Sequence, residues 1–172
     1  DMKLNEAPII EKLENSEYIT VVLIDGAIGK IRKDKLLTSV NYEYTTMSWS
    51  VRGWHRIAIS TASNAAISSA FFNIGNSFGT TPASSSCFYF AGSGYADRII
   101  SSIGKVGIIF PRVRVLYKPS TAHTLYIDIY YDFEGRNNIY LSASTVINMK
   151  FTSLDDSIAT IPEGYTAQEF AL

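Results

Sequence analysis

Short apolar runs in which hydrophobic and polar residues alternate are the clearest pattern along the chain. In residues 124–132 the odd positions are Leu125, Ile127, Ile129 and Tyr131, and the even positions include Tyr126, Asp128, Tyr130 and Asp132. Residues 112–118 alternate in the same way, with valines opposite arginines. A period of two with one apolar face predicts an antiparallel strand that meets a hydrophobic core on one side only.

Such runs recur from Val40 onward at the spacing expected of a β-sandwich or a β-barrel. The predicted strands are 40–51, 54–60, 69–74, 86–91, 99–105, 108–118, 124–131, 138–143 and 146–152, with a last strand or tail at 166–172. Loop-forming clusters such as 80–84 and 134–138 separate the runs, and the small, polar stretch 61–69 is predicted to be a loop. The pattern predicts an all-β domain, an antiparallel β-sandwich over residues 40–172.

Residues 1–39 differ in character, because they hold a dense share of the charge around one β-hairpin. Residues 18–24 are a strong strand signal, Asp25 and Gly26 are a favoured hairpin turn pair, and residues 27–32 return as the second strand. Residues 33–37 are predicted to form a short helical turn. This N-terminal β-hairpin precedes the predicted sandwich.

The apolar strand of the hairpin needs a cover, since an isolated two-stranded hairpin is not stable in water. Either the rest of the chain covers it, or copies of the same hairpin pack around an axis. We favour the second arrangement, in which the apolar residues of the hairpin make the contacts between copies. These oligomer-contact residues are Val21, Leu23, Ile24, Ile28 and Ile31.

Composition narrows the class of protein mainly by exclusion. Charged residues are 18% of the 172 residues and aromatics are 13%, with 11 Tyr and 9 Phe, a mix that favours strands over helices. The net charge is −1 with both signs interspersed, so no basic face for nucleic acid is expected. No apolar run approaches the length of a membrane span, and membrane insertion is not expected. The lone Cys87 rules out an internal disulfide framework and is interpreted as a buried structural thiol.

Catalytic and metal-binding patterns are not evident in the sequence. The chain has two histidines, and it has no nucleophile elbow that would place a serine beside one of them. His55 is interpreted as a strand-edge or interface residue and His123 as solvent-facing. One Cys and two distant His offer no ligand pair for zinc, and the pairs Asp155–Asp156 and Asp132–Glu134 lack a calcium-loop signature. No phosphate-binding glycine loop occurs, so no catalytic residue, metal or cofactor is expected.

A surface suited to recognition remains. Tyr126, Asp128, Tyr130 and Asp132 form a stripe on the outward side of one predicted strand, and Arg136 and Asn137 follow in the next loop. Carbohydrate recognition often pairs an aromatic platform for the C–H faces of a sugar with carboxylates or amides for its hydroxyls. Asn73 and Asn76 are further candidate contacts in loops. Alternatively the tyrosines pack against a neighbouring subunit or a second sheet, because aromatics also form buried interface cores.

Three stretches resemble bacteriophage tail-fibre and related virion appendage proteins. Residues 16–36 match a short hairpin motif, with an apolar run, an Asp-Gly turn and a final lysine-rich segment, that precedes a globular tip in those proteins. Residues 54–58, Trp-His-Arg-Ile-Ala, are similar to a strand of such tips. The chain also closes in a similar way, with Ile-Pro-Glu-Gly-Tyr at 161–165 and Glu-Phe at 169–170.

The resemblance implies a homotrimer on the virion, outside the host cell, without catalytic residues. The hairpin of residues 1–39 would act as a collar around the threefold axis, and residues 40–172 would form a jelly-roll-like receptor-binding tip. The partners implied are further copies of the chain, other virion proteins, and a glycan or protein on the host surface. Weak contacts from three tips would add up through avidity.

Two other functions stay open. One is a monomeric, secreted carbohydrate-binding module, in which Tyr126 and Tyr130 are open to solvent and bind an oligosaccharide. The other is a glycan-cleaving enzyme of the tailspike type, which needs two carboxylates at an active-site separation. For that enzyme the loose candidates are the pairs Asp128–Asp132 and Asp155–Asp156, and Glu163.

Overall fold

The computed structural model describes residues 18–22, 27–32, 41–61, 66–77, 82–93, 98–118, 124–152 and 155–172. The chain divides into two compact units, Asp1–Val40 and Asn41–Leu172, and each is described by itself. All regular secondary structure among the described residues is β-strand. The predicted helical turn at 33–37 lies outside the described residues, as do His123, the oligomer-contact residues Leu23 and Ile24, and the side chain of Val21.

The first unit contains the predicted hairpin. Strand β1 (Tyr18–Val22) pairs antiparallel with β2 (Ile28–Arg32), and Val22 lies opposite Ile28. Ile28 is 77% exposed and Tyr18 is 61% exposed, whereas Ile31 is half-buried. The hairpin prediction is confirmed, and the hairpin exposes the apolar side chain of Ile28.

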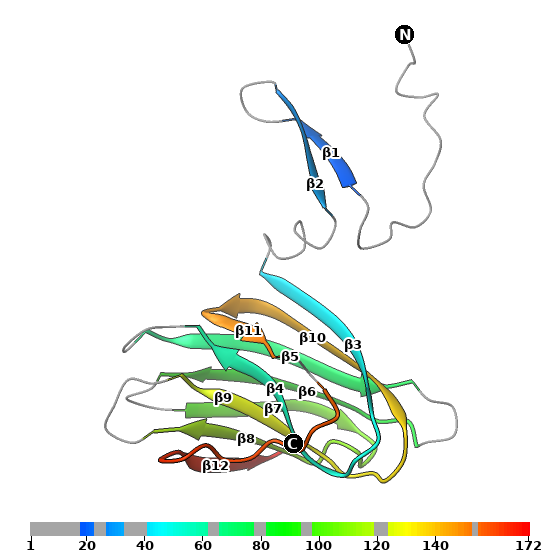
Figure 1. Ribbon diagram of the computed structural model, residues 1–172, viewed down its shortest axis with the longest axis vertical. Helices are drawn as coiled ribbons and strands as arrows, with labels where there is room; N and C mark the ends of the chain where they lie inside the picture. Colours follow the sequence, from blue (N-terminus) through cyan, green and yellow to red (C-terminus); the bar gives the residue numbers. More distant parts are fainter. Residues whose placement is uncertain are drawn as a thin grey trace. The chain divides into compact units, whose positions relative to one another are not determined.

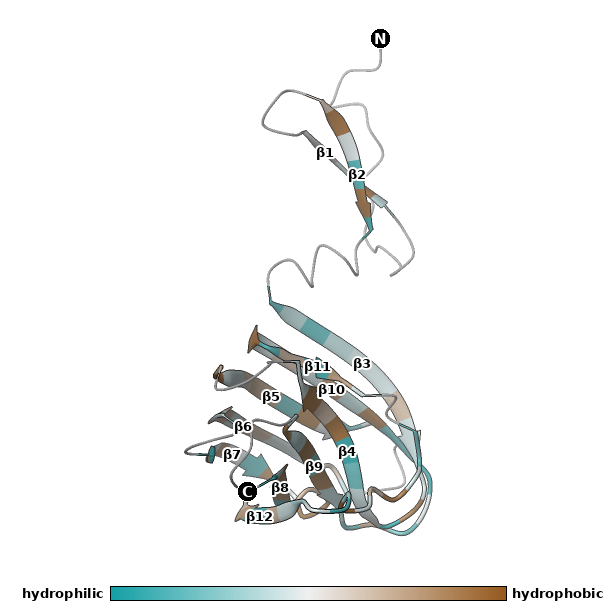
Figure 2. Ribbon diagram, turned by 60° about the vertical axis from the view of Figure 1, so that its left-hand side comes forward, coloured by the Kyte–Doolittle hydropathy of each residue, from teal (hydrophilic) through white to brown (hydrophobic). Residues whose placement is uncertain are grey.

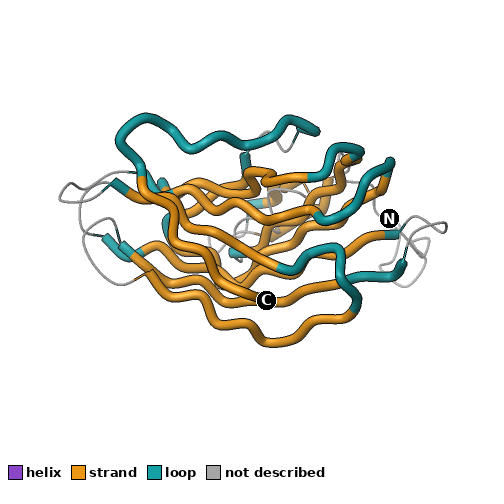
Figure 3. Tube along the Cα trace, turned by 90° about the horizontal axis from the view of Figure 1, so that it is seen from below, coloured by secondary structure: helices purple, strands orange, loops and turns teal. Residues whose placement is uncertain are grey.

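The second unit is an antiparallel β-sandwich of two five-stranded sheets (Figures 1 and 3). Sheet I has the order β3 (Tyr42–Trp49), β10 (Asn137–Ile147), β5 (Ser68–Asn76), β6 (Ser85–Gly92) and β7 (Arg98–Val106). Sheet II has the order β11 (Met149–Phe151), β4 (Gly53–Ser60), β9 (Tyr126–Tyr131), β8 (Arg112–Tyr117) and β12 (Thr166–Ala171). The predicted all-β sandwich is confirmed.

The strand order is nested, as in jelly rolls. The first strand of the unit, β3, pairs with β10, and the next strand, β4, pairs with β9 in the other sheet. Inside this nest, β5, β6 and β7 form a meander and β8 and β9 form a hairpin. The chain therefore changes sheets repeatedly, and strands that are distant in sequence lie at the centre of sheet I.

Alternating residues of both sheets build the core between the two layers. Ile127, Ile129 and Tyr131 of β9 are 0% exposed and face Phe72 and Phe88 of sheet I, which belong to the same buried cluster. In Figure 2 the brown of apolar residues recurs in bands along the strands of both sheets, whereas β3 is mainly pale and teal. The hydrophobic pattern that predicted the strands is thus also the pattern that buries them.

Two residues lie elsewhere than predicted. His55 is not at a strand edge or interface but fully buried, stacked on Trp49 with ring centroids 4.2 Å apart, and its Nε2 lies 2.8 Å from the carbonyl oxygen of Val51. Burial lowers the pKa of His55, so the ring is neutral and Nε2 donates to that carbonyl. Cys87 is only half-buried, because it points out of the sandwich between the inward-facing Ser86 and Phe88.

Candidate binding surfaces

The predicted tyrosine and aspartate stripe lies on the outer face of sheet II. Ile127 and Ile129 point into the core, so Tyr126, Asp128 and Tyr130 point out, as the alternation predicted. Part of this outer face is covered, however, because the chain between β11 and β12 passes over it.

The crossing follows from the strand order. β11 and β12 are at opposite edges of sheet II, so the chain that joins them must traverse the sheet (Figure 1, orange to red). Along β4, the N–H of Thr152 donates to the carbonyl of Ile57 (3.2 Å) and the N–H of Ala159 donates to the carbonyl of Trp54 (2.7 Å). Residues 155–165 are called the crossing segment below.

A row of alternating charges holds the crossing segment on the sheet. Arg56, Asp128, Arg114 and Glu169 lie side by side on β4, β9, β8 and β12. The Nε atoms of Arg56 and Arg114 each lie 2.9 Å from a carboxylate oxygen of Asp128. The same guanidinium groups donate to carbonyl oxygens of the crossing segment, Arg56 to Thr160 (3.0 Å) and Arg114 to Ala159 (2.8 Å).

This row corrects the prediction that Asp128 contacts a ligand. The Asp128 side chain is 0% exposed, and the side chains of Arg56 and Arg114 are 23% and 6% exposed. A buried carboxylate that binds two guanidinium groups is satisfied within the protein. Asp128 therefore anchors the sheet to the segment that covers it.

Tyr126 also packs against the crossing segment. The Arg56 guanidinium lies 4.2 Å from the centre of the Tyr126 ring, and the ring of Tyr165 lies 5.2 Å away. Burial, with a contribution from Tyr126, raises the pKa of Tyr165, so the phenol of Tyr165 is neutral near neutral pH. Tyr126 is half-buried and mainly packs against its own chain.

The rest of the stripe forms a small aromatic and cationic patch. The rings of Trp54 and Tyr130 meet edge to face at 5.2 Å, and the Arg112 guanidinium lies 4.5 Å from the Tyr130 ring centre. Arg112 also pairs with Glu169 at 3.2 Å. Asp132 pairs with Arg52 at 2.5 Å, where both side chains are partly exposed.

Of the two residues predicted as loop contacts, Asn137 is buried and Arg136 is exposed. Asn137 is the first residue of β10 and is 0% exposed, so it does not contact a ligand; its Oδ1 accepts from Asn76 at 3.4 Å. Asn76 in turn binds the backbone of Pro82 and Ser84, which braces the chain between β5 and β6. Arg136 is exposed, and its Nε donates to the hydroxyl of Ser48 on β3 (3.2 Å).

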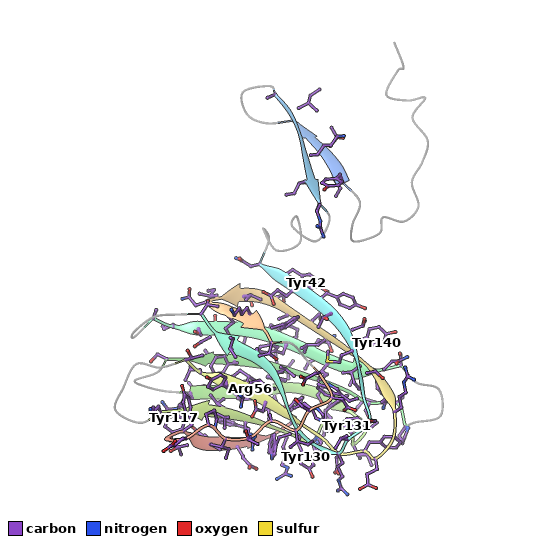
Figure 4. The ribbon with its side chains drawn as sticks, viewed as in Figure 1. Tyr42, Arg56, Tyr117, Tyr130, Tyr131 and Tyr140 are labelled. Carbon is purple, nitrogen blue, oxygen red and sulfur yellow. The ribbon has the colours of Figure 1, made fainter. Side chains whose placement is uncertain are left out.

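The outer face of sheet I has a different chemistry, without charged residues. Opposite the buried Ile139, Leu141 and Ala143 of β10, the outward positions of β3, β10, β5 and β6 are tyrosines, small hydroxyl residues, amides and a few apolar residues. These positions, called the tyrosine face below, are Tyr42, Tyr44, Thr46, Ser48, Asn138, Tyr140, Ser142, Ser144, Phe71, Asn73, Gly75, Ser85, Cys87, Tyr89 and Ala91. Tyr42 and Tyr140 are labelled in Figure 4.

A shallow groove of about 340 Å³ runs along this face where β3 meets β10. It is lined by Thr46, Met47, Ser48, Asn138 and Tyr140. The Tyr140 ring lies roughly parallel to that of Tyr44, with centroids 6.4 Å apart and 26° between the planes, and the two residues are 40% and 48% exposed. Burial and the neighbouring phenols of Tyr140 and Tyr42 raise the pKa of Tyr44. The groove therefore offers the aromatic face of Tyr140 beside hydroxyl and amide groups, with the Tyr44 ring next to it.

A second pocket, of about 260 Å³, lies between β4 and the crossing segment. Asp155 contributes to its lining, and hydrogen bonds from the side chain and N–H of Ser157 lower the pKa of that carboxyl. Burial acts to raise the pKa of Asp156, but bonds from the hydroxyl and N–H of Ser50 and the N–H of Val51 outweigh it, and the pKa is lowered. Both carboxylates are therefore ionised and occupied by bonds to the chain.

Within the described ranges, no group of three or more His, Cys, Asp or Glu residues is arranged to hold a metal ion. None of the described residues form a helix that is long and apolar enough to cross a membrane.

The signal for the tyrosine face was present in the sequence, in the alternation of 42–48 and 138–144, but the tyrosine and aspartate stripe has the stronger contrast between its two sides.

Comparison with known proteins gives little for this chain. No family model and no curated protein matches it. Among solved structures, the crystal structure of the tailspike protein of Acinetobacter phage vB_ApiP_P1 is similar, with a TM-score of 0.33 and 16% sequence identity. The similarity covers 88% of this chain and 26% of that chain. This chain thus spans about a quarter of the length of that tailspike protein.

Proposed function

We propose that this chain is a virion module of a phage tail fibre that binds a glycan on the host surface as a homotrimer, without catalysis. The tyrosine face, with its groove at Tyr140, is the observation that carries the glycan-binding part. The virion part is supported by the resemblance of residues 16–36, 54–58, 161–165 and 169–170 to tail-fibre proteins. In this proposal residues 1–39 are the collar and residues 40–172 are the tip.

The groove has the chemistry that a neutral sugar needs. The rings of Tyr44 and Tyr140 present flat apolar surface to the C–H faces of a sugar, at a low cost in side-chain entropy. Thr46, Ser48 and Asn138 supply hydroxyl and amide groups, which both donate and accept hydrogen bonds as sugar hydroxyls do. A shallow groove binds weakly, and three linked copies raise the overall affinity by avidity.

The state of the carboxylates supports a role without catalysis. Glycoside hydrolysis needs one carboxylic acid with a raised pKa and a second carboxylate facing it. Asp128 is enclosed by two arginines, Asp132 pairs with Arg52, and the pKa values of Asp155 and Asp156 are lowered. These four candidates therefore bind groups of the protein itself, and Asp155 and Asp156 lack the raised pKa that the catalytic acid needs.

The test is binding of the purified chain to an array of bacterial surface polysaccharides, with Tyr140→Ala as the test variant and Tyr89→Ala as its matched control. Tyr89 is on the tyrosine face too and is 38% exposed, but it lies on β6, away from the groove. Wild type and Tyr89→Ala should bind a neutral polysaccharide, and Tyr140→Ala should lose roughly tenfold or more in affinity.

Three results would contradict the proposal. They are binding only to acidic polysaccharides, equal affinity of wild type and Tyr140→Ala, and shortening of the bound polysaccharide on incubation. The last result would mean a glycan-cleaving enzyme.

A monomeric carbohydrate-binding module is the second candidate, because the groove lies within one copy of the chain. Light scattering after size exclusion separates the two functions. A mass near three times 19.0 kDa supports the fibre, and a mass near 19.0 kDa supports the module.

A further inference from the structure

Gly75 lies beside Tyr140 of the groove, at a position where neither the backbone nor the packing requires a glycine. Its pairing is regular on both sides, opposite Tyr140 on β10 and opposite Ser85 on β6. A Cβ there would make only ordinary contacts, at 3.5 Å or more, and the backbone is not left-handed. The nearest atoms would belong to Ser84 and Ser85, so the Tyr140 ring does not fill this space. A glycine in a strand often marks a place where a ligand comes close to the backbone.

Asn73 presents an oriented amide group next to this space. It lies two residues before Gly75 on the same face of β5, and its side chain is exposed. Its Oδ1 accepts hydrogen bonds from the hydroxyl of Ser85 (3.3 Å) and the thiol of Cys87 (3.5 Å). Its Nδ2 makes no hydrogen bond to the described part of the chain. Because Nδ2 carries two N–H donors, Asn73 offers both of them to a ligand above Gly75.

The groove, Gly75 and Asn73 lie along one path across sheet I. The strands β10, β5 and β6 are neighbours in the sheet (Figure 1). Tyr140, which is labelled in Figure 4, both lines the groove and lies opposite Gly75. Neighbouring strands are about 5 Å apart, so the path from β10 to β6 measures roughly 10 Å. That distance is longer than one sugar ring and gives room for two linked sugars.

We propose that a neutral polysaccharide crosses sheet I along this path. One sugar lies in the groove at Tyr140, and the next lies over Gly75, where the N–H groups of Asn73 donate to its hydroxyl or ring oxygens. The inference rests on the glycan binding of the proposed function and deepens it, because it names two linked sugars, rather than one, as the unit that is recognised.

The place of the path within the sheet favours a glycan over a peptide. Peptides often bind by adding a strand to an open sheet edge. β5 has no open edge, since β10 and β6 pair with its two sides. What remains for a ligand is the face of the sheet, where the amide of Asn73 and the hydroxyls of Ser85 and Ser142 match the hydroxyl groups of sugars.

Binding of the full chain to three probes, measured by titration in the NMR spectrometer, tests the inference. The first probe is the neutral polysaccharide with the strongest signal on the array. The other two are the disaccharides and the single sugars that acid hydrolysis releases from that polysaccharide.

The two test variants act on different atoms. Gly75→Val fills the space over β5 with a residue that suits a strand. Asn73→Asp keeps an oxygen for the two bonds that orient the side chain, but it has no N–H to donate. Gly104→Val is the matched control, because a side chain at Gly104 would also meet open space, on β7 and away from the groove. Circular dichroism verifies that each variant keeps its strands.

Wild type and Gly104→Val should bind the polysaccharide and at least one of its disaccharides with equal affinity. Gly75→Val and Asn73→Asp should each lose roughly three- to tenfold in affinity for these two probes. Neither should lose affinity for the single sugar, because that sugar needs only the groove.

Failure of the inference and failure of the proposed function give different results. If Tyr140→Ala loses affinity for the polysaccharide while Gly75→Val or Asn73→Asp binds as tightly as wild type, the glycan site stands and the path is wrong. If wild type binds no neutral polysaccharide, both are wrong. An equal loss in Gly104→Val would mean that an added valine acts through the sheet, and would overturn the role of Gly75.

Discussion

At the scale of single residues, Asp128 anchors the segment that covers part of the outer face of sheet II. Burying an unpaired carboxylate is costly, and the cost is offset here by two guanidinium groups. Arg56 and Arg114 use their remaining N–H groups to hold the carbonyls of Thr160 and Ala159. One carboxylate thus orients two arginines, and the arginines hold the segment that covers the sheet.

Replacement of Asp128 by Ala should lower the free energy of unfolding by about 3–5 kcal/mol, because it leaves two largely buried guanidinium groups without a counter-charge. Urea denaturation measures this loss. Asp132→Ala is the matched control, since it removes one partner of the exposed Arg52 pair and should cost about 0–1 kcal/mol. Equal losses in the two variants would mean that Asp128 is not a buried anchor.

At the scale of elements, the strands themselves were predictable. The predicted strand 54–60 is Gly53–Ser60 in the structure, and the predicted strand 86–91 is Ser85–Gly92. The period of two is a property of each strand alone, so it can be read without knowing its neighbours. A break was predicted near residue 144, but β10 continues to Ile147 because a bulge, with Thr145 at φ 52°, absorbs the irregularity.

The covering of an outer face was not predictable in this way. Asp128 has the same alternating pattern as a solvent-facing residue, and the segment that buries it is irregular and lies about thirty residues further along the chain. Which strands pair, and therefore where a connection must cross, is not encoded in the periodicity. For the same reason the sequence did not indicate that Asn137 is buried or that the outward residues of β3 and β10 meet to form a groove.

Gly107, between β7 and β8, is the position where the backbone most clearly needs glycine. Its φ is +77°, and an added Cβ would collide with the carbonyl oxygen of Ala83 and the hydroxyl of Ser84. That hydroxyl accepts bonds from the N–H groups of Ile108 and Ile109. The turn therefore packs closely against Ser84, and these bonds fix the backbone at Ile108 and Ile109.

Gly107→Ala should therefore destabilise the sandwich by about 1–3 kcal/mol, through backbone strain and the collision with Ser84. The control is Gly75→Ala, because a Cβ there would make only ordinary contacts at 3.5 Å or more. Thermal unfolding of the two variants gives the comparison. A Gly107 variant as stable as the Gly75 variant would show that the turn relaxes freely.

At the scale of the whole molecule, all residues of the buried cluster belong to the second unit. They run from Trp49 to Met149, and the partly buried residues packed against them run from Met47 to Leu172. Among the described residues, none of this cluster belongs to the hairpin unit. The sandwich therefore has a core of its own.

We expect residues 41–172 to fold without the hairpin unit and to keep the near-ultraviolet circular dichroism of the full chain, which reports on buried Trp49 and its aromatic neighbours. Cooperative unfolding in urea is the second measurement. A loss of the near-ultraviolet signal, with the far-ultraviolet signal retained, would contradict an independent core.

The place of β10 within sheet I also decides when the molecule can finish folding. Tyr42 at the start of β3 pairs with Ser144 near the end of β10, so β3 has no neighbouring strand until the ribosome has made most of the chain. At typical rates of synthesis this delay is roughly 5–20 seconds. The β5–β7 meander can form earlier, but it waits with one open edge for β10. The sandwich therefore closes only late in the synthesis of the chain. Slower synthesis would lengthen the time during which the edges of β3 and β5 can pair with other chains.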